Sequence, residues 1–156
     1  TKSLVETNKI FNEAYETFKT LGPQEIAFVM GVKGYEKRAV ACKGFETVKG
    51  MPVHAKSAYF YNQLLDKLGT GNKYEEISSG DKVRYMYVET PNKYGISTIG
   101  FKYEYPKEFE EIFKVDYEKM FDKILYQSIS RFYDNVNWSI RKPSENVQTE
   151  LFDLFA

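Results

Sequence analysis

KVRYMYVET, residues 82–90, alternates between two sets of side chains. From Val83 onward every second residue falls on one side of an extended chain, and the residues between them fall on the other. Because β-branched and aromatic residues recur with a period of two, this stretch predicts a β-strand. The turn sequence TPNKYG (90–95) and a second extended stretch, ISTIGFKY (96–103), follow directly. Together they predict an antiparallel β-ribbon.

Helical patterns flank this ribbon on both sides. Apolar residues recur at spacings of three and four, and the sequences LGP and GTGN end two of these runs. The helices are expected at residues 4–21, 54–68, 105–113 (a short acidic turn) and 116–135. EIAF (25–28) is expected to be a short strand or extended piece, and residues 31–50 to be loop-rich with at most short strands. A few helices with a small sheet predict an α+β fold.

The overall composition sets broad limits on the class of protein. The 156 residues carry no net charge but include 13 Tyr and 12 Phe, and such rings favour surfaces that are half-buried at interfaces. Cys42 is the single cysteine, so no internal disulfide can form and a reducing compartment is expected. No long apolar run is present, so we expect a soluble, intracellular protein with no membrane partner.

Positive charge is concentrated in residues 33–67, called the basic segment below. It holds seven Lys or Arg residues against three Asp or Glu residues, a net charge of 7 − 3 = +4. Several glycines accompany these cations, and glycine lets the backbone approach a ligand closely. Such a segment can neutralise DNA phosphates if its cations share one face. It is also the composition of an ordinary solvent-exposed loop region, and the sequence alone leaves both interpretations open.

No catalytic or metal-binding motif is recognisable in the chain. Walker, Rossmann and hydrolase-elbow patterns are missing, and one His with one Cys cannot build a zinc site. Acidic pairs such as Glu75/Glu76 are more typical of a solvated face than of a metal site. His54 lies at an expected helix start, where it could reach a phosphate or serve a structural role.

The expected long helix carries a polar ridge at steps of four residues. Its members are Lys119, Lys123, Gln127 and Arg131. A basic ridge of this kind can follow a phosphate backbone. The same pattern also describes an ordinary solvent-exposed helix face.

The last residues, QTELFDLFA (148–156), are unusually apolar for a chain end. Gln148, Leu151, Leu154 and Phe155 have the spacing of one short helical turn, which is not stable alone but can dock into a partner's groove. Packing on the chain's own domain is the alternative. The preceding RKPSEN (141–146) is typical of a tether, which favours a partner.

Five blocks in this order resemble one known family. They are GPQEIAFVMGVKGYEKR (22–38), GMPVHAKSAYFYNQLL (50–65), SGDKVRYMYVETPNKYGISTIGF (79–101), YPKEFEEIFKVDYEKMFDKIL (105–125) and LFDLF (151–155). From about Pro23 to its end, the chain resembles the C-terminal thumb of family B DNA polymerases from large tailed phages. No single block is a catalytic motif, and the specificity lies in their combination and order.

The resemblance implies roles for named residues. The thumb of that family grips the primer–template duplex, mainly through phosphates. In this sequence the resemblance places His54, Lys56, Tyr61 and Asn62 near the duplex or in support of that surface. It places Lys123 against the phosphate backbone, whereas Gln127 stands where the family has a second lysine. The terminal peptide, with Gln148, Leu151, Phe152, Leu154 and Phe155, is similar to the segment that binds the sliding clamp.

The palm and exonuclease carboxylates of the family are missing from this chain. The resemblance therefore implies a part of a DNA-directed DNA polymerase that is inactive alone, with no catalytic residue and no cofactor of its own. Mg²⁺ and the phosphoryl transfer would belong to a palm- and exonuclease-bearing partner, the chain being either a split subunit or a fragment. The expected location is the cytoplasm of an infected bacterium.

The expected division has three parts. Residues 1–22 form a helix that links to or docks on the palm, residues 23–142 form the helical thumb with its β-ribbon, and residues 143–156 form a tether with the clamp-binding peptide. Two other functions stay open. One is a freestanding clamp-associated or DNA-binding adaptor, and the other is a small aromatic-rich protein that binds single strands.

Overall fold

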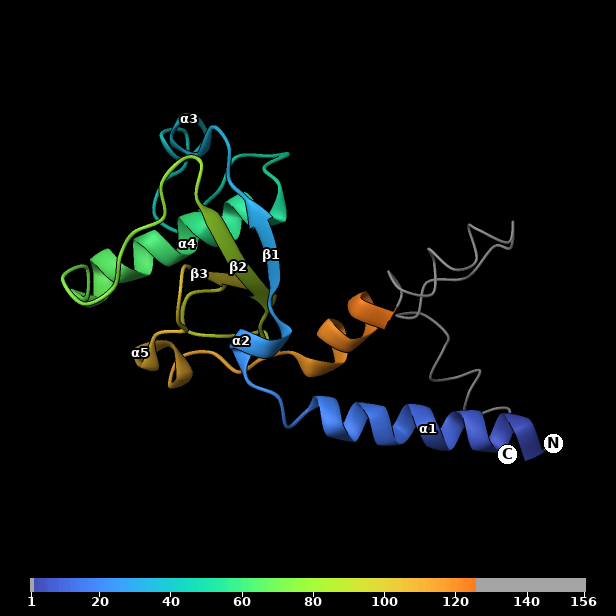
Figure 1. The fold of residues 1–156 in the computed structure, drawn as a ribbon. Coiled ribbons are helices and arrows are strands. Elements are labelled where there is room, and N and C mark those ends of the chain that lie inside the picture. Colours follow the sequence, from blue (N-terminus) through green and yellow to red (C-terminus); the bar gives the residue numbers. More distant parts are fainter. Residues whose placement is uncertain (1, 126–156) are drawn as a thin grey trace. The chain divides into compact units, whose positions relative to one another are not determined.

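A three-stranded antiparallel sheet with one long helix packed against it forms the centre of residues 22–116 (Figure 1). The computed structural model describes residues 2–125, which fall into two compact units. Residues 22–116 form the first unit. Residues 2–21 and 117–125 together form the second, so this unit is built from two separate parts of the chain.

The predicted β-ribbon is confirmed. β2 (Lys82–Tyr87) pairs antiparallel with β3 (Thr98–Phe101), with Arg84 opposite Phe101 and Tyr87 opposite Thr98. β2 is the central strand, because β1 (Phe28–Gly31) pairs with its other edge. Val83 and Met86 of β2 are fully buried, and so is Ile99 of β3. The sheet order β1-β2-β3 therefore places the alternating stretch at the centre of this unit.

The long helix α4 (Val53–Leu68) packs closely on β3, and it matches the helix predicted at residues 54–68. Gly100 makes this approach possible, since a Cβ atom there would lie 2.8 Å from the Ser57 carbonyl oxygen and 2.7 Å from a Val83 methyl group. Ala58, Leu64 and Leu65 are fully buried on the helix. The contact between α4 and β3 thus forms a large part of the core of this unit.

Two expectations for residues 22–50 were wrong. Glu25 and Ile26 do not begin a strand, because they belong to the single turn α2 (Pro23–Ile26) and β1 starts at Phe28. Pro23 presets this turn, and the Glu25 carboxylate accepts the Gly22 amide N–H at 3.1 Å. Residues 31–50 contain a short helix, α3 (Tyr35–Ala39), besides the isolated bridge between Lys43 and Glu46. Tyr35 is the buried residue of α3.

α5 (Lys107–Glu110) is the short acidic turn expected within residues 105–113. Phe109 is fully buried there and lies edge-on to three other rings, with ring centres 5.7–6.2 Å apart. The three rings belong to Tyr61, Tyr105 and Phe113. The aromatic residues that are frequent in the sequence thus build part of the core, and Phe109 attaches α5 to it.

The second unit contains α1 (Lys2–Phe18) and a helical segment at residues 117–125. Phe18 packs against Tyr117 and Phe121, with ring centres 5.9 and 5.4 Å apart, and the Tyr117 hydroxyl donates to the Leu21 carbonyl at 2.7 Å. The helices predicted at residues 4–21 and 116–135 are therefore present within the described residues. The remainder of the second one lies outside them.

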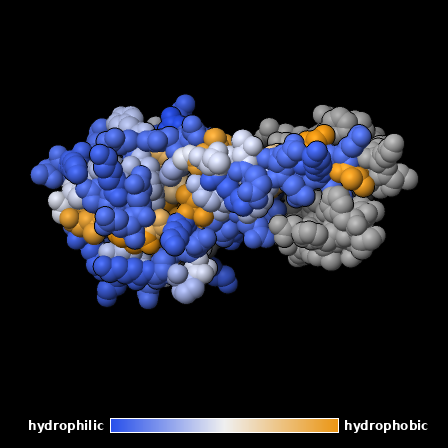
Figure 2. Space-filling model, turned by 90° about the horizontal axis from the view of Figure 1, so that it is seen from below, coloured by the Kyte–Doolittle hydropathy of each residue, from blue (hydrophilic) through white to orange (hydrophobic). Residues whose placement is uncertain are grey.

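Most of the face shown in Figure 2 is hydrophilic, with hydrophobic side chains in small, separate patches. The large apolar residues that are most exposed within the described part of the chain include Val40, at 86%, and Ile10, at 65%. Among residues 2–125, no helix has both the length and the apolar character that a membrane span requires.

Candidate nucleic-acid interface

The cations of the basic segment are not neutralised by neighbours. All except the half-buried Lys56 are exposed: Lys33, Lys37, Arg38, Lys43, Lys49 and Lys67. The ion pairs formed within residues 22–116 involve two other lysines. Lys73 binds Glu108 at 2.9 Å, and Lys102 binds both Glu75 and Asp81 at 3.0 Å. The positive charge of residues 33–67 is thus available to an anionic partner.

His54 and Lys56 lie in the first turns of α4, beside α3. Burial lowers the pKa of His54, and the positive charge of Arg38 lowers it further. The imidazole is therefore neutral at neutral pH, where it can still donate or accept one hydrogen bond. Arg38 of α3 and His54 of α4 thus lie close enough for the positive charge of Arg38 to act on the imidazole.

A partly open cavity of about 260 Å³ lies next to these residues. Four segments form it: residues 45–47, the first half of α4, the end of β2, and residues 95–98. Its lining consists of Phe45, Thr47, Val53, Lys56, Phe60, Tyr87, Gly95, Ile96, Ser97 and Thr98. The cavity is called the Lys56 pocket below.

Four polar side chains of the Lys56 pocket have no partner within residues 2–125. They are Thr47, Lys56, Ser97 and Thr98, none of which forms a side-chain hydrogen bond or an ion pair there. Thr98 is only 4% exposed, whereas Thr47 and Lys56 are half-buried and Ser97 is exposed. Polar side chains that line one cavity and have no protein partner are typical of a ligand site.

One wall of the pocket is held in place by Asn92. Its side-chain Nδ2 donates to the carbonyls of Glu89 (3.0 Å) and Ile96 (2.6 Å), and its Oδ1 accepts the Tyr94 and Ile96 amide N–H groups at 3.2 and 3.3 Å. Gly95 adopts a φ of 66°, a left-handed conformation that favours glycine. The turn between β2 and β3 is therefore fixed before any ligand arrives.

An aromatic and cationic cluster adjoins the pocket through Phe45. The ring of Phe45 lies 4.9 Å from that of Tyr94 and 6.2 Å from that of Phe60, measured between ring centres. The Lys67 ammonium lies 5.5 Å from the centre of the Phe45 ring and 5.3 Å from that of Tyr94. Lys93 lies over the Tyr94 ring at 5.7 Å. Rings with adjacent cations are typical of surfaces that bind nucleic acid strands.

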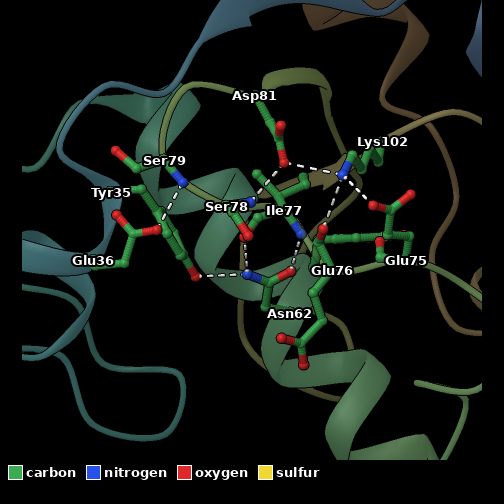
Figure 3. Close-up of polar contacts among 11 residues, drawn as sticks. Tyr35, Glu36, Asn62, Glu75, Glu76, Ile77, Ser78, Ser79, Asp81 and Lys102 are labelled. Carbon is green, nitrogen blue, oxygen red and sulfur yellow. Dashed lines mark hydrogen bonds and ion pairs between the residues drawn. The ribbon is translucent and has the colours of Figure 1, made fainter.

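Tyr61 and Asn62 of α4 fasten the loop between α4 and β2. Tyr61 is 2% exposed, and its hydroxyl donates to the Glu75 carbonyl at 2.9 Å. The Asn62 amide donates to the Tyr35 hydroxyl (2.9 Å) and the Ile77 carbonyl (2.8 Å), and it accepts the Ile77 N–H (2.9 Å; Figure 3). Of the two roles that the resemblance implies, this placement fits support of the surface.

Further contacts to this loop were not foreseen from the sequence. Glu36 accepts the Ser79 amide N–H at 2.8 Å, and this bond lowers the pKa of the carboxyl group. Asp81 accepts the Ser78 N–H at 2.8 Å and pairs with Lys102, and both contacts lower its pKa (Figure 3). The one signal in the sequence is the run SSGD (78–81), a turn composition. No local sequence pattern indicates that Glu36 and Lys102, which are distant in the chain, bind this turn.

The remaining predicted site residues lie in the second unit or outside the described residues. Lys119 is exposed and Lys123 half-buried on the helical segment of the second unit. Gln127, Arg131 and the expected clamp-binding residues (Gln148, Leu151, Phe152, Leu154 and Phe155) lie outside the described residues. Cys42 contacts the Arg38 carbonyl and the Met51 sulfur, at 3.4 and 3.6 Å. Within residues 2–125 no group of three His, Cys, Asp or Glu side chains is placed to hold a metal ion.

Neither a protein-family model nor a curated protein matches this sequence. An exposed basic segment and a polar-lined pocket with adjacent aromatic rings come together around the first half of α4. This arrangement suits an anionic ligand with a planar group, which is the chemistry of a nucleotide.

Proposed function

We propose that this chain is the thumb part of a DNA-directed DNA polymerase, which grips the primer–template duplex through its phosphates and tethers the enzyme to a sliding clamp. The observation that carries the proposal is the basic segment, whose seven cations form no ion pairs within the described residues. The five blocks resembling phage polymerase thumbs support the same function. Contacts to phosphates would let the protein bind any DNA sequence.

The lysines of α3 and its preceding turn provide a direct test. Changing Lys33→Gln and Lys37→Gln together should weaken binding of a paired DNA hairpin equally for all sequences. The slope of log affinity against log salt should fall by about two, since each phosphate contact contributes about 0.9. The matched control is Lys107→Gln with Lys114→Gln, which removes two exposed lysines outside the basic segment. Equal effects of the two pairs would show that the basic segment has no special role.

The polymerase part of the proposal is tested by reconstitution. The chain alone should incorporate no nucleotide on a primed template with Mg²⁺, because the carboxylates of two-metal catalysis are missing from the sequence. A palm- and exonuclease-bearing polymerase that lacks its thumb should bind the chain and gain activity. If the two never co-purify, the freestanding DNA-binding adaptor becomes the better explanation.

A further inference from the structure

We infer that the Lys56 pocket binds the base of an unpaired nucleotide in a DNA strand. The inference rests on the proposed function and extends it, because a thumb that only grips phosphates has no need for a polar-lined cavity. The pocket contains three aromatic rings, three hydroxyl-bearing side chains besides tyrosine and one lysine. These groups match the separate parts of a nucleotide.

The size of the pocket limits the ligand. A cavity of about 260 Å³ is just below the range of roughly 300–1,000 Å³ that holds drug-sized ligands. Its volume therefore suits a single planar ring system with part of its sugar. Its open side leaves the rest of the nucleotide outside.

The aromatic residues provide a surface for stacking. Phe45 and Phe60 line the pocket from two different segments, and Phe45 also packs on Tyr94 outside it. Because every base has a π-face, stacking of this kind tolerates any sequence. A base that enters the pocket thus gains contact without sequence preference, as a polymerase requires.

The polar residues of the pocket can bind the base edge and the phosphate of a nucleotide. The hydroxyls of Thr47, Ser97 and Thr98 can each donate or accept a hydrogen bond, so they can satisfy the edge of any base. Lys56 supplies a positive charge at the same cavity for the phosphate of that nucleotide. Because these four side chains have no partner within residues 2–125, binding breaks no existing contact of theirs.

The pocket selects an unpaired nucleotide for a geometric reason. A base within the duplex is stacked and paired, and it reaches a protein cavity only after both contacts are broken. An unpaired base at a strand end has already lost its pair. Since Asn92 fixes the pocket wall in advance, little ordering opposes its entry.

The experiment uses the full chain and two DNA hairpins that differ at one nucleotide. The first is fully paired with 2-aminopurine at its 3′ end, and the second carries the same base as an unpaired 3′ nucleotide. The unpaired hairpin should bind at least about fivefold more tightly, the lower end of what stacking on aromatic side chains gives, with a change in 2-aminopurine fluorescence. Equal affinity for both hairpins would overturn the inference, while failure to bind the paired hairpin would overturn the proposed function instead.

Variants separate the pocket from the phosphate contacts. Phe45→Leu and Thr98→Val should each reduce the preference for the unpaired hairpin, measured as the ratio of the two affinities, towards one. Lys49→Gln is the control, because it removes an exposed lysine of the basic segment outside the pocket and should weaken both hairpins equally. Thermal melting checks that each variant is folded. An unchanged preference in a folded Thr98→Val or Phe45→Leu protein would contradict the inference.

A competition experiment tests whether the ligand is a free nucleotide or a nucleotide within a DNA strand. Free 2-aminopurine deoxyribonucleoside monophosphate should compete only at far higher concentration than the unpaired hairpin, because it lacks the phosphates that the basic segment contacts. Tight binding of the free nucleotide would show a site for small molecules and overturn the strand as ligand. Preference for a single strand over both hairpins would likewise overturn it and favour a single-strand binding protein.

Discussion

Asn62 illustrates, at the scale of one residue, why the contacts of a helix side chain cannot be predicted from its place in the sequence. An Asn on a helix beside Tyr61 could equally face DNA or the protein interior. In the structure its side-chain amide donates to the Ile77 carbonyl and accepts the Ile77 N–H, in the loop that leads to β2. No spacing rule connects residue 62 to residue 77, since the contact depends on how the loop folds back. The sequence singles out Asn62, but its hydrogen bonds to Ile77 follow only from the fold.

Replacing Asn62 tests this supporting role. Asn62→Ala should lower the free energy of unfolding by about 1–3 kcal/mol, because the buried N–H and carbonyl of Ile77 lose their partners. Chemical denaturation measures the change. Gln63→Ala, at the adjacent half-buried position of α4, is the control and should have little effect. If Asn62→Ala keeps full stability but loses DNA affinity, the side chain contacts DNA.

His54 predicts a pH dependence of stability. The pKa of His54 in the folded state lies below the ordinary value for histidine. Between these two pH values the unfolded chain therefore binds more protons than the folded chain. Stability should therefore rise with pH through the interval just below about 6.5. On acidification it should fall in that interval until the folded imidazole is protonated too. His54→Gln should flatten this part of the profile in denaturation experiments.

Because the chain has a single His, its titration can be followed by NMR without ambiguity. Arg38→Gln should raise the pKa of His54 only in part, since burial is the larger cause of the shift. A complete return to the ordinary value would show that Arg38 dominates instead.

At the scale of elements, long periodic stretches were predictable and short ones were not. The alternation in residues 82–90 and the helical spacing in residues 54–68 give many repeated signals, and both elements form as predicted. β1 and α3 have four and five residues, too few for any period to be recognised. Their positions are set by pairing with β2 and by packing against α4, which are contacts between distant parts of the chain.

The close packing of α4 on β3 predicts the effect of one methyl group. Gly100→Ala should destabilise the protein by about 1–3 kcal/mol, because its Cβ would meet the Ser57 backbone and Val83 at less than 3 Å. Gly31→Ala is the control, since Gly31 is the exposed last residue of β1 in the same sheet and a Cβ there has nothing within 4 Å. Thermal denaturation measures the stability of both variants, and Gly100→Ala should melt at the lower temperature. Equal melting temperatures would show that the helix can shift at no cost.

At the scale of the whole molecule, zero net charge conceals a local excess. The sequence identified the basic segment by counting, but counting cannot show which cations are already paired. The structure does so for residues 22–116, where Lys73 and Lys102 are paired and the cations of residues 33–67 are not. The Lys56 pocket could not be predicted at all. Its walls come from four segments that only the fold brings together.

Removing the terminal peptide tests the proposed attachment to a clamp. Deleting residues 151–156 should leave the melting temperature and short-range synthesis by the reconstituted polymerase intact, while clamp-stimulated processivity is lost. Two or three apolar anchors worth roughly 1.5–3 kcal/mol each give only weak binding by the peptide alone. A clamp already encircling the DNA makes that contact effectively intramolecular. A much lower melting temperature would show that the peptide belongs to the protein's own core.

The hydrogen bond between Tyr117 and Leu21 has a consequence for how the chain can be rearranged. It joins the two points where the backbone leaves the second unit and returns to it, so the intervening residues 22–116 begin and end at neighbouring positions. A segment with adjacent ends can be moved as a cassette. We expect it to tolerate circular permutation, and to fold when grafted into a surface loop of an unrelated host protein.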